Sequence, residues 1–243
     1  MQKIITIPAL GDNFIYLCEY EAGRVFVVDP GEARSVVSAL EKHCLELSHI
    51  LITHNHFDHC GGVAALVEKF GCEVITPSGE IDRTVSIGLE EVTVIATPGH
   101  TAGSVCYYLG AVEKYPPVVF TGDTLFVSGC GRIFECSAKT MYDSLLKLAS
   151  LDDETVVYPG HDYTDENYRF ALQFDGDNKI IRERLIEIKT DPTSAFTSTV
   201  GLEKQTNPFL RASLPGIKAA LDMAGATDVE TFAELRRRKN SFG

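Results

Sequence analysis

The chain has 243 residues, of which 44% are hydrophobic and 23% are charged, a balance typical of a soluble folded protein with one or two domains. Its 22 basic and 34 acidic residues give a formal net charge of -12, which disfavours nucleic acid as a partner because polyanions are repelled. No apolar run approaches the roughly 20 residues of a membrane span, and no secretory signal opens the chain. We therefore expect a cytoplasmic protein with no membrane partner.

Short runs of β-branched and aromatic residues alternate with helical periods up to about residue 160, which predicts an α/β fold. In chain order, strands are predicted at 3–7, 13–19, 24–29, 50–53, 73–76, 92–96, 104–109, 118–121 and 155–158. Apolar residues at three- and four-residue spacing predict helices between them, at 33–43, 62–70 and 139–149.

The pattern changes after Tyr163, and no further strand is expected beyond residue 165. Helices are predicted at 166–174 and 179–189, and the Ser- and Thr-rich segment 191–208 is predicted to be irregular. Thr227 and Glu230 have the spacing of a capping box, which predicts a last helix through Lys239. We therefore predict two domains, an α/β domain over residues 1–164 and a helical domain over residues 165–243.

Three of the seven histidines lie in one six-residue window, His54-Asn55-His56-Phe57-Asp58-His59. The window follows an apolar strand and is predicted to be a loop at the carboxyl end of that strand, where open α/β sheets bind their ligands. The His-x-His spacing places two imidazoles on the same side of an extended segment. The adjacent pair Asp58-His59 directs a second set of candidate ligand groups away from that side. Because imidazole and carboxylate groups bind metal ions, the window predicts a metal site.

Three later strands each deliver one histidine or aspartate directly after a glycine, whose missing side chain permits a close approach of the backbone. A single catalytic zinc ion keeps about three protein ligands, so the candidates are too many for one ion, and two ions sharing a carboxylate fit better. The seven candidate ligands are His54, His56, Asp58, His59, His100, Asp123 and His161.

Four further residues lie near this pattern without joining it. His43 and His49 are isolated and are expected at the surface or at a helix end. Cys60 is expected to pack as a small thiol, like most of the seven cysteines, which have no Cys-x-x-Cys spacing and indicate a reducing compartment. Asp29 is expected to hold the loop backbone by hydrogen bonds rather than to bind metal.

The motif Thr53-His54-x-His56-x-Asp58-His59, followed by Gly99-His100-Thr101, Gly122-Asp123 and Gly160-His161, resembles the metallo-β-lactamase superfamily. This resemblance implies an αββα sandwich, here with a C-terminal helical domain. Within the superfamily, other segments resemble glyoxalase II, the hydroxyacylglutathione hydrolase family, over essentially the whole chain. These segments are 122–126, 129–135, 160–164, 207–211 and the terminal run Arg236-Arg237-Arg238-Lys239 with Phe242.

The family resemblance implies a role for each candidate ligand. His54, His56 and His100 would hold one metal ion, Asp58, His59 and His161 a second, and Asp123 would bridge them. We expect two divalent ions per chain, zinc in the first place, with iron or manganese as alternatives. A hydroxide held by both ions would hydrolyse S-D-lactoylglutathione to glutathione and D-lactate, and His54, Asp58 and Asp123 are the expected catalytic residues.

The resemblance also implies that residues 165–243 bind glutathione, in a chain that we expect to be monomeric. The expected substrate contacts are Arg132, Phe134, Tyr163, Arg236 and Lys239. The chain departs from the family pattern at Phe134, where tyrosine is common, at Cys136, where glycine is usual, and at Ser104, where histidine is common. The basic run also has a simpler interpretation, because cations stabilise a helix C-terminus by ~0.3–1 kcal/mol.

Three alternatives remain open from the sequence. A mononuclear-iron glutathione persulfide dioxygenase belongs to the same superfamily, but its relatives usually lack the long helical tail with terminal basic residues. A hydrolase for another thiol ester would share all the ligands. A zinc-storing or structural protein is disfavoured because closed structural sites usually have four ligands and much cysteine.

Overall fold

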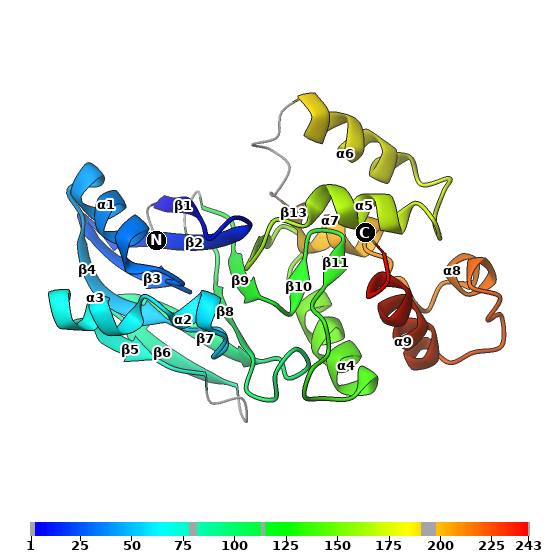
Figure 1. The fold of residues 1–243 in the computed structure, drawn as a ribbon, viewed down its shortest axis with the longest axis horizontal. Helices are drawn as coiled ribbons and strands as arrows, with labels where there is room; N and C mark the ends of the chain where they lie inside the picture. The colour runs from blue at the N-terminus through cyan, green and yellow to red at the C-terminus, as the bar shows by residue number, and fades with distance from the viewer. Residues whose placement is uncertain (1–2, 78–81, 113–114, 191–197, 243) are drawn as a thin grey trace.

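The computed structural model describes residues 3–77, 82–112, 115–190 and 198–242. Two sheets pack face to face between outer helices, and further helices lie at the C-terminal end (Figure 1). The α/β fold with the αββα arrangement is therefore confirmed. No helix in the described part of the chain has both the length and the apolar character needed to cross a membrane.

The first sheet has the order β1-β2-β3-β4-β5, with β1 and β2 antiparallel to their neighbours and β3, β4 and β5 parallel. Its strands are β1 (Lys3–Ala9), β2 (Asn13–Glu21), β3 (Arg24–Val28), β4 (Glu46–Leu51) and β5 (Glu73–Ile75). Helices α1 (Ala33–His43) and α3 (Val63–Phe70) pack on its outer face. The middle of strand β2 is apolar on both faces because Ile15 and Leu17 face these helices while Tyr16 and Cys18 face the second sheet.

The second sheet has the order β13-β12-β9-β8-β7-β6. Its strands are β6 (Arg83–Ile87), β7 (Glu90–Ala96), β8 (Val105–Leu109), β9 (Val118–Gly122), β12 (Val156–Pro159) and β13 (Ser198–Thr199). Its outer face, with Cys106, Val119 and Val157, packs on α4 (Ala138–Ala149) and on helices of the tail. Aromatic contacts such as Tyr16 with Phe120, whose ring centroids lie 5.4 Å apart, join the two sheets.

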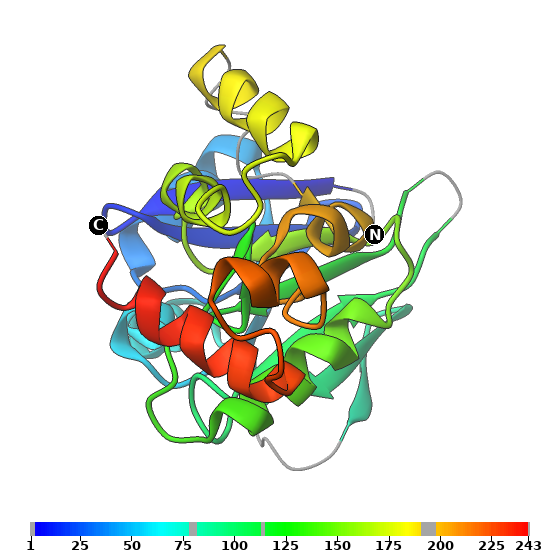
Figure 2. The same ribbon diagram turned by 90° about the vertical axis from the view of Figure 1, so that its right-hand side faces the viewer.

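The tail is mainly helical, as predicted (Figure 2). Its helices are α5 (Thr164–Ala171), α6 (Lys179–Thr190), α7 (Val200–Thr206), α8 (Pro215–Ala220) and α9 (Asp228–Lys239). The predicted capping box is confirmed, because Thr227 accepts from the Glu230 backbone and the Glu230 side chain accepts from the Thr227 backbone. Helix α9 therefore begins and ends where the sequence places it.

Several predictions about elements were wrong. Residues 198–206 are not irregular, because β13 pairs with β12 and α7 follows it, while residues 191–197 lie outside the described part of the chain. A strand therefore does occur beyond residue 165. The sequence patterns also missed β6, α8 and the short strands β10 (Leu125–Phe126) and β11 (Gly129–Cys130), which are too short or too polar for periodicity to reveal. The domain boundary at 164/165 stays a prediction.

One buried carboxylate joins the tail to the rest of the molecule. Glu203 on α7 is fully buried and accepts hydrogen bonds from the Ser128 backbone (2.8 Å), the Ser198 hydroxyl (2.5 Å) and the Asn207 amide (2.8 Å). Burial raises the pKa of Glu203 to about 7, although these donors and the nearby Arg184 oppose the rise. The folded state therefore holds a proton on this group at a pH where the unfolded chain has released it.

This raised pKa predicts a pH-dependent stability difference for Glu203→Gln. The parent's extra stability is fully present below the unfolded pKa of about 4.3 and is lost as the pH rises through the folded pKa of about 7. The free energy of unfolding of the parent should therefore fall relative to the variant over this interval, by at most about 1.4 kcal/mol per pH unit. Urea unfolding of both proteins at pH 5, 6 and 7.5 measures it. A difference that does not change with pH would contradict the assignment.

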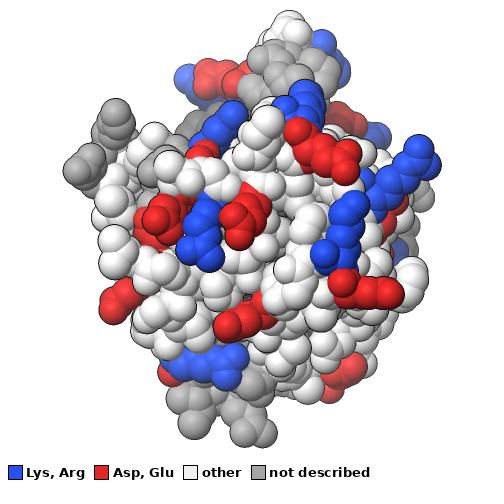
Figure 3. Space-filling view, turned by 90° about the vertical axis from the view of Figure 1, so that its left-hand side faces the viewer, with Lys and Arg blue, Asp and Glu red and all other residues white. Residues whose placement is uncertain are grey.

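Charged side chains of both signs mix over the outer surface near α1 and α3, and neither sign forms a continuous patch on this face (Figure 3). The described residues of this face therefore form no basic stripe of the kind that tracks a nucleic-acid backbone.

Candidate metal centre and substrate pocket

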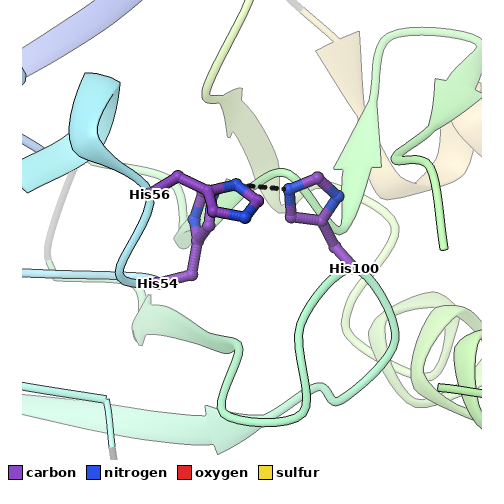
Figure 4. A group of neighbouring side chains, drawn as sticks. All are labelled: His54, His56 and His100. Carbon is purple, nitrogen blue, oxygen red and sulfur yellow. Dashed lines mark hydrogen bonds between the residues drawn. The ribbon is translucent and has the colours of Figure 1, made fainter. Parts of the chain in front are cut away.

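The histidine window lies directly after β4, at the carboxyl edge of the first sheet. His54 and His56 lie in the predicted loop, but Asp58 and His59 lie in a short helix, α2 (Phe57–Cys60), which corrects the loop prediction for these two residues. The His56 Nδ1 atom is 3.1 Å from His54 Nε2 and 3.0 Å from His100 Nε2. Three imidazoles from two segments thus point at one another (Figure 4).

A second group forms beside the first. The His59 Nε2 atom is 3.2 Å from His161 Nε2, and Asp58 Oδ2 lies 3.5 Å and 3.4 Å from these two nitrogens. One ligand atom from each residue lies within 4.8 Å of the others, as in the first group. The structure therefore brings six of the predicted ligands together as two triads.

Asp123 lies between the two triads. Its Oδ1 is 3.4 Å from both His59 Nε2 and His161 Nε2, and its Oδ2 is 3.4 Å from His100 Nε2. Oδ1 is buried and has no hydrogen-bond partner among the described residues, a costly state for a carboxylate oxygen unless a cation satisfies it. Burial would raise the pKa of Asp123, but His161 and His59 hold it below its usual range. This donor set fits divalent metal ions.

Three of these histidines are supported from behind, because the Nδ1 atom of each lies within hydrogen-bonding distance of an oxygen atom. His59 Nδ1 is 3.0 Å from Asp29 Oδ2, His100 Nδ1 is 2.8 Å from the Arg132 carbonyl, and His161 Nδ1 is 2.9 Å from Asp12 Oδ1. Such contacts orient each ring and direct its Nε2 toward the centre. Sequence patterns missed Asp12, because it is 149 residues from its partner and its turn carries no ligand motif.

The expected hydrogen-bonding role of Asp29 is confirmed. Its carboxylate accepts from the Thr53 backbone (2.7 Å) and the Thr53 hydroxyl (2.6 Å) in addition to its contact with His59. Burial would lower the pKa of His59, but the contacts with Asp29 raise it to about 9. By contrast, burial lowers the pKa of His54 to about 2, so this imidazole is neutral and can donate its lone pair.

Glycine residues permit close packing around the two triads. The sequence predicts this because a glycine directly precedes His100, Asp123 and His161. A Cβ atom on Gly160 would lie 2.6 Å from Asp123 Oδ1 and 2.7 Å from His59 Cε1. A Cβ atom on Gly131 would lie 1.9 Å from the Asp123 carbonyl oxygen. A side chain at Gly160 would displace the carboxylate between the triads, and one at Gly131 would displace the backbone of Asp123.

The remaining candidates lie outside the triads. His43 ends α1 and is exposed, as expected. His49, expected at the surface or at a helix end, lies in the middle of β4 and is half-buried, and its Nδ1 contacts the Ser48 hydroxyl. Cys60 is half-buried, and its thiol lies 3.7 Å from the Asn55 carbonyl.

A cavity of about 410 Å³ opens beside the two triads. Five of the predicted ligands line it, and so do all five predicted substrate contacts, namely Arg132, Phe134, Tyr163, Arg236 and Lys239. Tyr163 stacks on His161 with ring centroids 5.1 Å apart, and the exposed ring of Phe134 lies 5.1 Å from His100. Sequence reasoning missed Phe126, Glu166 and Asn167, which also line the cavity.

Side chains of the tail hold one wall of this cavity. The wall is the β10–β11 hairpin with the residue that follows it, Gly131. Asn167, Asn207 and Arg236 donate to carbonyl oxygens of this wall, at 3.0 Å to Val127, 2.9 Å to Gly129 and 2.6 Å to Cys130. Glu203 accepts from the backbone of the same segment at Ser128. The tail therefore shapes the cavity as well as contributing side chains to it.

Only two members of the terminal basic run line the cavity. Arg236 and Lys239, one helical turn apart on α9, are nearly buried there. Arg237 and Arg238 pair instead with Glu234 on the same helix. The simple helix-end interpretation therefore suits Arg237 and Arg238, but not the two cations that line the cavity.

Comparison with known proteins agrees with this geometry. Residues 9–84 and 78–161 match the model of the metallo-beta-lactamase superfamily, and residues 162–242 match that of the hydroxyacylglutathione hydrolase C-terminus. The chain is 44% identical to a hydroxyacylglutathione hydrolase of Rhizobium meliloti, over 95% of both chains. It is 43% identical to one of Brucella abortus, again over 95% of both.

Solved structures share the fold. ETHE1 from Myxococcus xanthus has a TM-score of 0.68 and 27% identity, over 98% of this chain and 92% of that one. TTHA1623, solved in a di-iron-bound form, has a TM-score of 0.59 and 27% identity, over 86% of this chain and all of its own length (100%). With two family models and relatives above 40% identity over nearly its full length, the chain belongs to the hydroxyacylglutathione hydrolase family of the metallo-β-lactamase superfamily.

Proposed function

We propose that the protein hydrolyses S-(2-hydroxyacyl)glutathione thioesters, converting S-D-lactoylglutathione to glutathione and D-lactate. The observation that carries this proposal is one cavity lined both by metal-ligand side chains of the two triads and by three cations. The names of the curated relatives supply the substrate class. The match of the tail to the C-terminal family model favours this reaction over the persulfide dioxygenase alternative.

The assignment of ligands is part of the proposal. One divalent ion would be held by His54, His56 and His100. The other would be held by Asp58, His59 and His161, and Asp123 would bind both ions. Zinc is our first choice, with iron and manganese as alternatives, because His and Asp donors accept all three and because TTHA1623 was solved with two irons. Two such ions, when bound, lower the pKa of water and polarise a carbonyl oxygen.

The chain's own residues bind and orient the substrate. Arg132, Arg236 and Lys239 would bind the carboxylates of glutathione, and Tyr163 and Phe134 would flank its thioester. Asp58 would accept a hydrogen bond from the attacking water and orient it toward the carbonyl carbon. No general acid is required, because a thiolate with a pKa near 8.5 can leave without being protonated first.

The two predicted domains would divide this work, with residues 1–164 as the catalytic domain and residues 165–243 as the glutathione-binding domain. We also propose a reducing compartment such as the cytoplasm, which the seven free cysteines support.

A steady-state comparison of S-D-lactoylglutathione with other thiol esters tests the function, with metal content determined on the same sample. We expect the glutathione ester to be preferred, with about two ions per chain. Chelation should abolish hydrolysis, and added metal should restore it. Oxygen consumption with glutathione persulfide, without loss of lactoylglutathione, would overturn the proposal in favour of the dioxygenase.

A further inference from the structure

An acidic side chain lies among the cations of the substrate cavity. Glu166, in the first turn of α5, pairs with the Lys239 ammonium of α9, and both side chains line the cavity. Their exposed fractions are 37% for Glu166 and 9% for Lys239. The carboxylate is therefore the member of the pair that can turn toward solvent.

The Lys239 ammonium lies against two aromatic rings and close to two other cations. Its Nζ atom is 5.4 Å from the centroid of the Phe242 ring and 5.8 Å from that of Phe170. Burial lowers the pKa of Lys239 and the contact with Glu166 opposes this, while the charges of Arg236 and Arg132 add to the fall. Glu166 therefore serves as the counterion of an ammonium that is nearly buried beside two guanidinium groups.

The other two cations of the cavity have no such counterion. Neither Arg132 nor Arg236 forms an ion pair with a carboxylate in the described part of the chain. Arg236 instead donates to the Cys130 carbonyl (2.6 Å) and to Asn240 Oδ1 (3.1 Å). Their guanidinium groups can therefore bind an anionic group of a ligand without displacing a carboxylate of the protein.

The two carboxylates of glutathione differ in the charge that surrounds them. The γ-glutamyl carboxylate shares its carbon with an ammonium group, whereas the glycine carboxylate stands alone. A cluster of three cations favours the group whose negative charge is not offset. The glycine carboxylate is therefore the part of the carrier that suits the site beside Arg236 and Lys239.

Glu166 already makes with Lys239 the contact that this carboxylate needs. Two carboxylates beside one ammonium repel each other, so the carrier either binds against this repulsion or displaces Glu166. Displacement breaks an ion pair, although the displaced carboxylate keeps its favourable place in the first turn of α5. By either route, Glu166 reduces the affinity of the cavity for the carrier.

We propose that Glu166 competes with the glycine carboxylate of the carrier for Lys239, and thereby weakens the binding of glutathione thioesters. The inference rests on the proposed thioester hydrolysis and concerns a carboxylate to which that function assigns no role. The simpler interpretation is an ion pair that joins α5 to α9 and orients Lys239 for the substrate. The two interpretations differ in sign, because loss of the Glu166 charge strengthens binding under competition and weakens it under orientation.

Two thioesters that differ only in one charge test the proposal. The first is S-D-lactoylglutathione, and the second is its glycine carboxamide, which keeps the length and loses the carboxylate charge. Both are assayed with the metal-loaded parent protein, with Glu166→Gln, with Glu166→Ala and with the control Asp165→Asn. The control removes a neighbouring carboxylate that pairs with Arg169 and does not line the cavity.

We expect both Glu166 variants to lower the KM of S-D-lactoylglutathione about two- to fivefold, the effect of one partly exposed ion pair. The KM of the carboxamide should change less, because a neutral amide is not repelled by Glu166, and Asp165→Asn should behave as the parent. A KM of S-D-lactoylglutathione that rises or stays unchanged would overturn the proposal. An equal fall for both thioesters would overturn it too, because the effect would not depend on the carboxylate.

The failure of the inference and the failure of the proposed function are distinguishable. If the parent hydrolyses the thioesters but the Glu166 variants do not bind S-D-lactoylglutathione more tightly, only the role of Glu166 is refuted. If the parent hydrolyses neither thioester, the proposed function is refuted. Calorimetric titration with S-methylglutathione then decides the role of Glu166. Tighter binding by Glu166→Gln than by the parent supports competition, and equal, weaker or absent binding refutes it.

Discussion

Asp58→Ala is expected to remove most of the thioester hydrolysis, lowering kcat by on the order of 10²- to 10⁴-fold, while the protein stays folded. Asp58 Oδ2 lies 3.4 Å from His161 Nε2 at the edge of the second triad, and the Asn13 amide donates to it at 3.1 Å. The side chain is 42% exposed toward the cavity side, so its loss leaves no void in the core. The change removes a proposed ligand and the carboxylate that would orient water.

Steady-state kinetics, metal content and thermal unfolding measured on the same sample check this prediction. Asp143→Asn is a matched control, because it removes an exposed carboxylate of α4 that pairs with Lys139 and does not line the cavity. The isosteric Asp58→Asn should retain the shape and the contact with Asn13 but not the charge. Near-normal kcat in a folded Asp58→Ala protein would refute the catalytic assignment.

Arg236→Ala is expected to raise the KM for the glutathione thioester about 10- to 100-fold, with a much smaller change in kcat. The guanidinium is nearly buried, lies 5.3 Å from the Phe209 ring and lines the cavity away from the triads. A contact remote from the reacting carbonyl contributes equally to ground-state and transition-state binding, so its loss appears in KM. Hydrogen bonds to a charged group, worth about 1.5–3 kcal/mol, set the size of the effect.

The adjacent Arg237→Ala is the matched control, because Arg237 pairs with Glu234 and does not line the cavity. The KM of Arg236→Lys should lie between those of the parent and of Arg236→Ala, since an ammonium keeps the charge but not the planar fork of donors. Thermal unfolding of the same variants measures the stability lost with the hydrogen bond to the Cys130 carbonyl. A fall in kcat at unchanged KM would contradict a substrate-binding role for Arg236.

Local sequence patterns were sufficient to predict the helices α1, α4 and α9, the α/β class of the fold and the turns that carry the candidate ligands, whereas the two-sheet sandwich was implied by the family resemblance. Each of these depends on residues close together in the chain, such as the His-x-His spacing or the capping box of Thr227 and Glu230. A glycine before His100, Asp123 and His161 likewise marks a tight turn within a few residues. Periodicity and turn chemistry can be read without knowing which segments meet.

Tertiary contacts decided the rest. Three contacts join residues that are far apart in the chain. They are Asp12 with His161 (149 positions), Glu203 with Ser128 (75 positions) and Glu166 with Lys239 (73 positions). No local pattern distinguishes Arg236 and Lys239 from Arg237 and Arg238, because only the packing of α9 against the cavity wall turns one pair inward. By itself the sequence determined which side chains could bind metal, whereas the folded chain decided their supporting partners and the charges of the pocket, since burial and hydrogen bonding between distant segments exist only after folding.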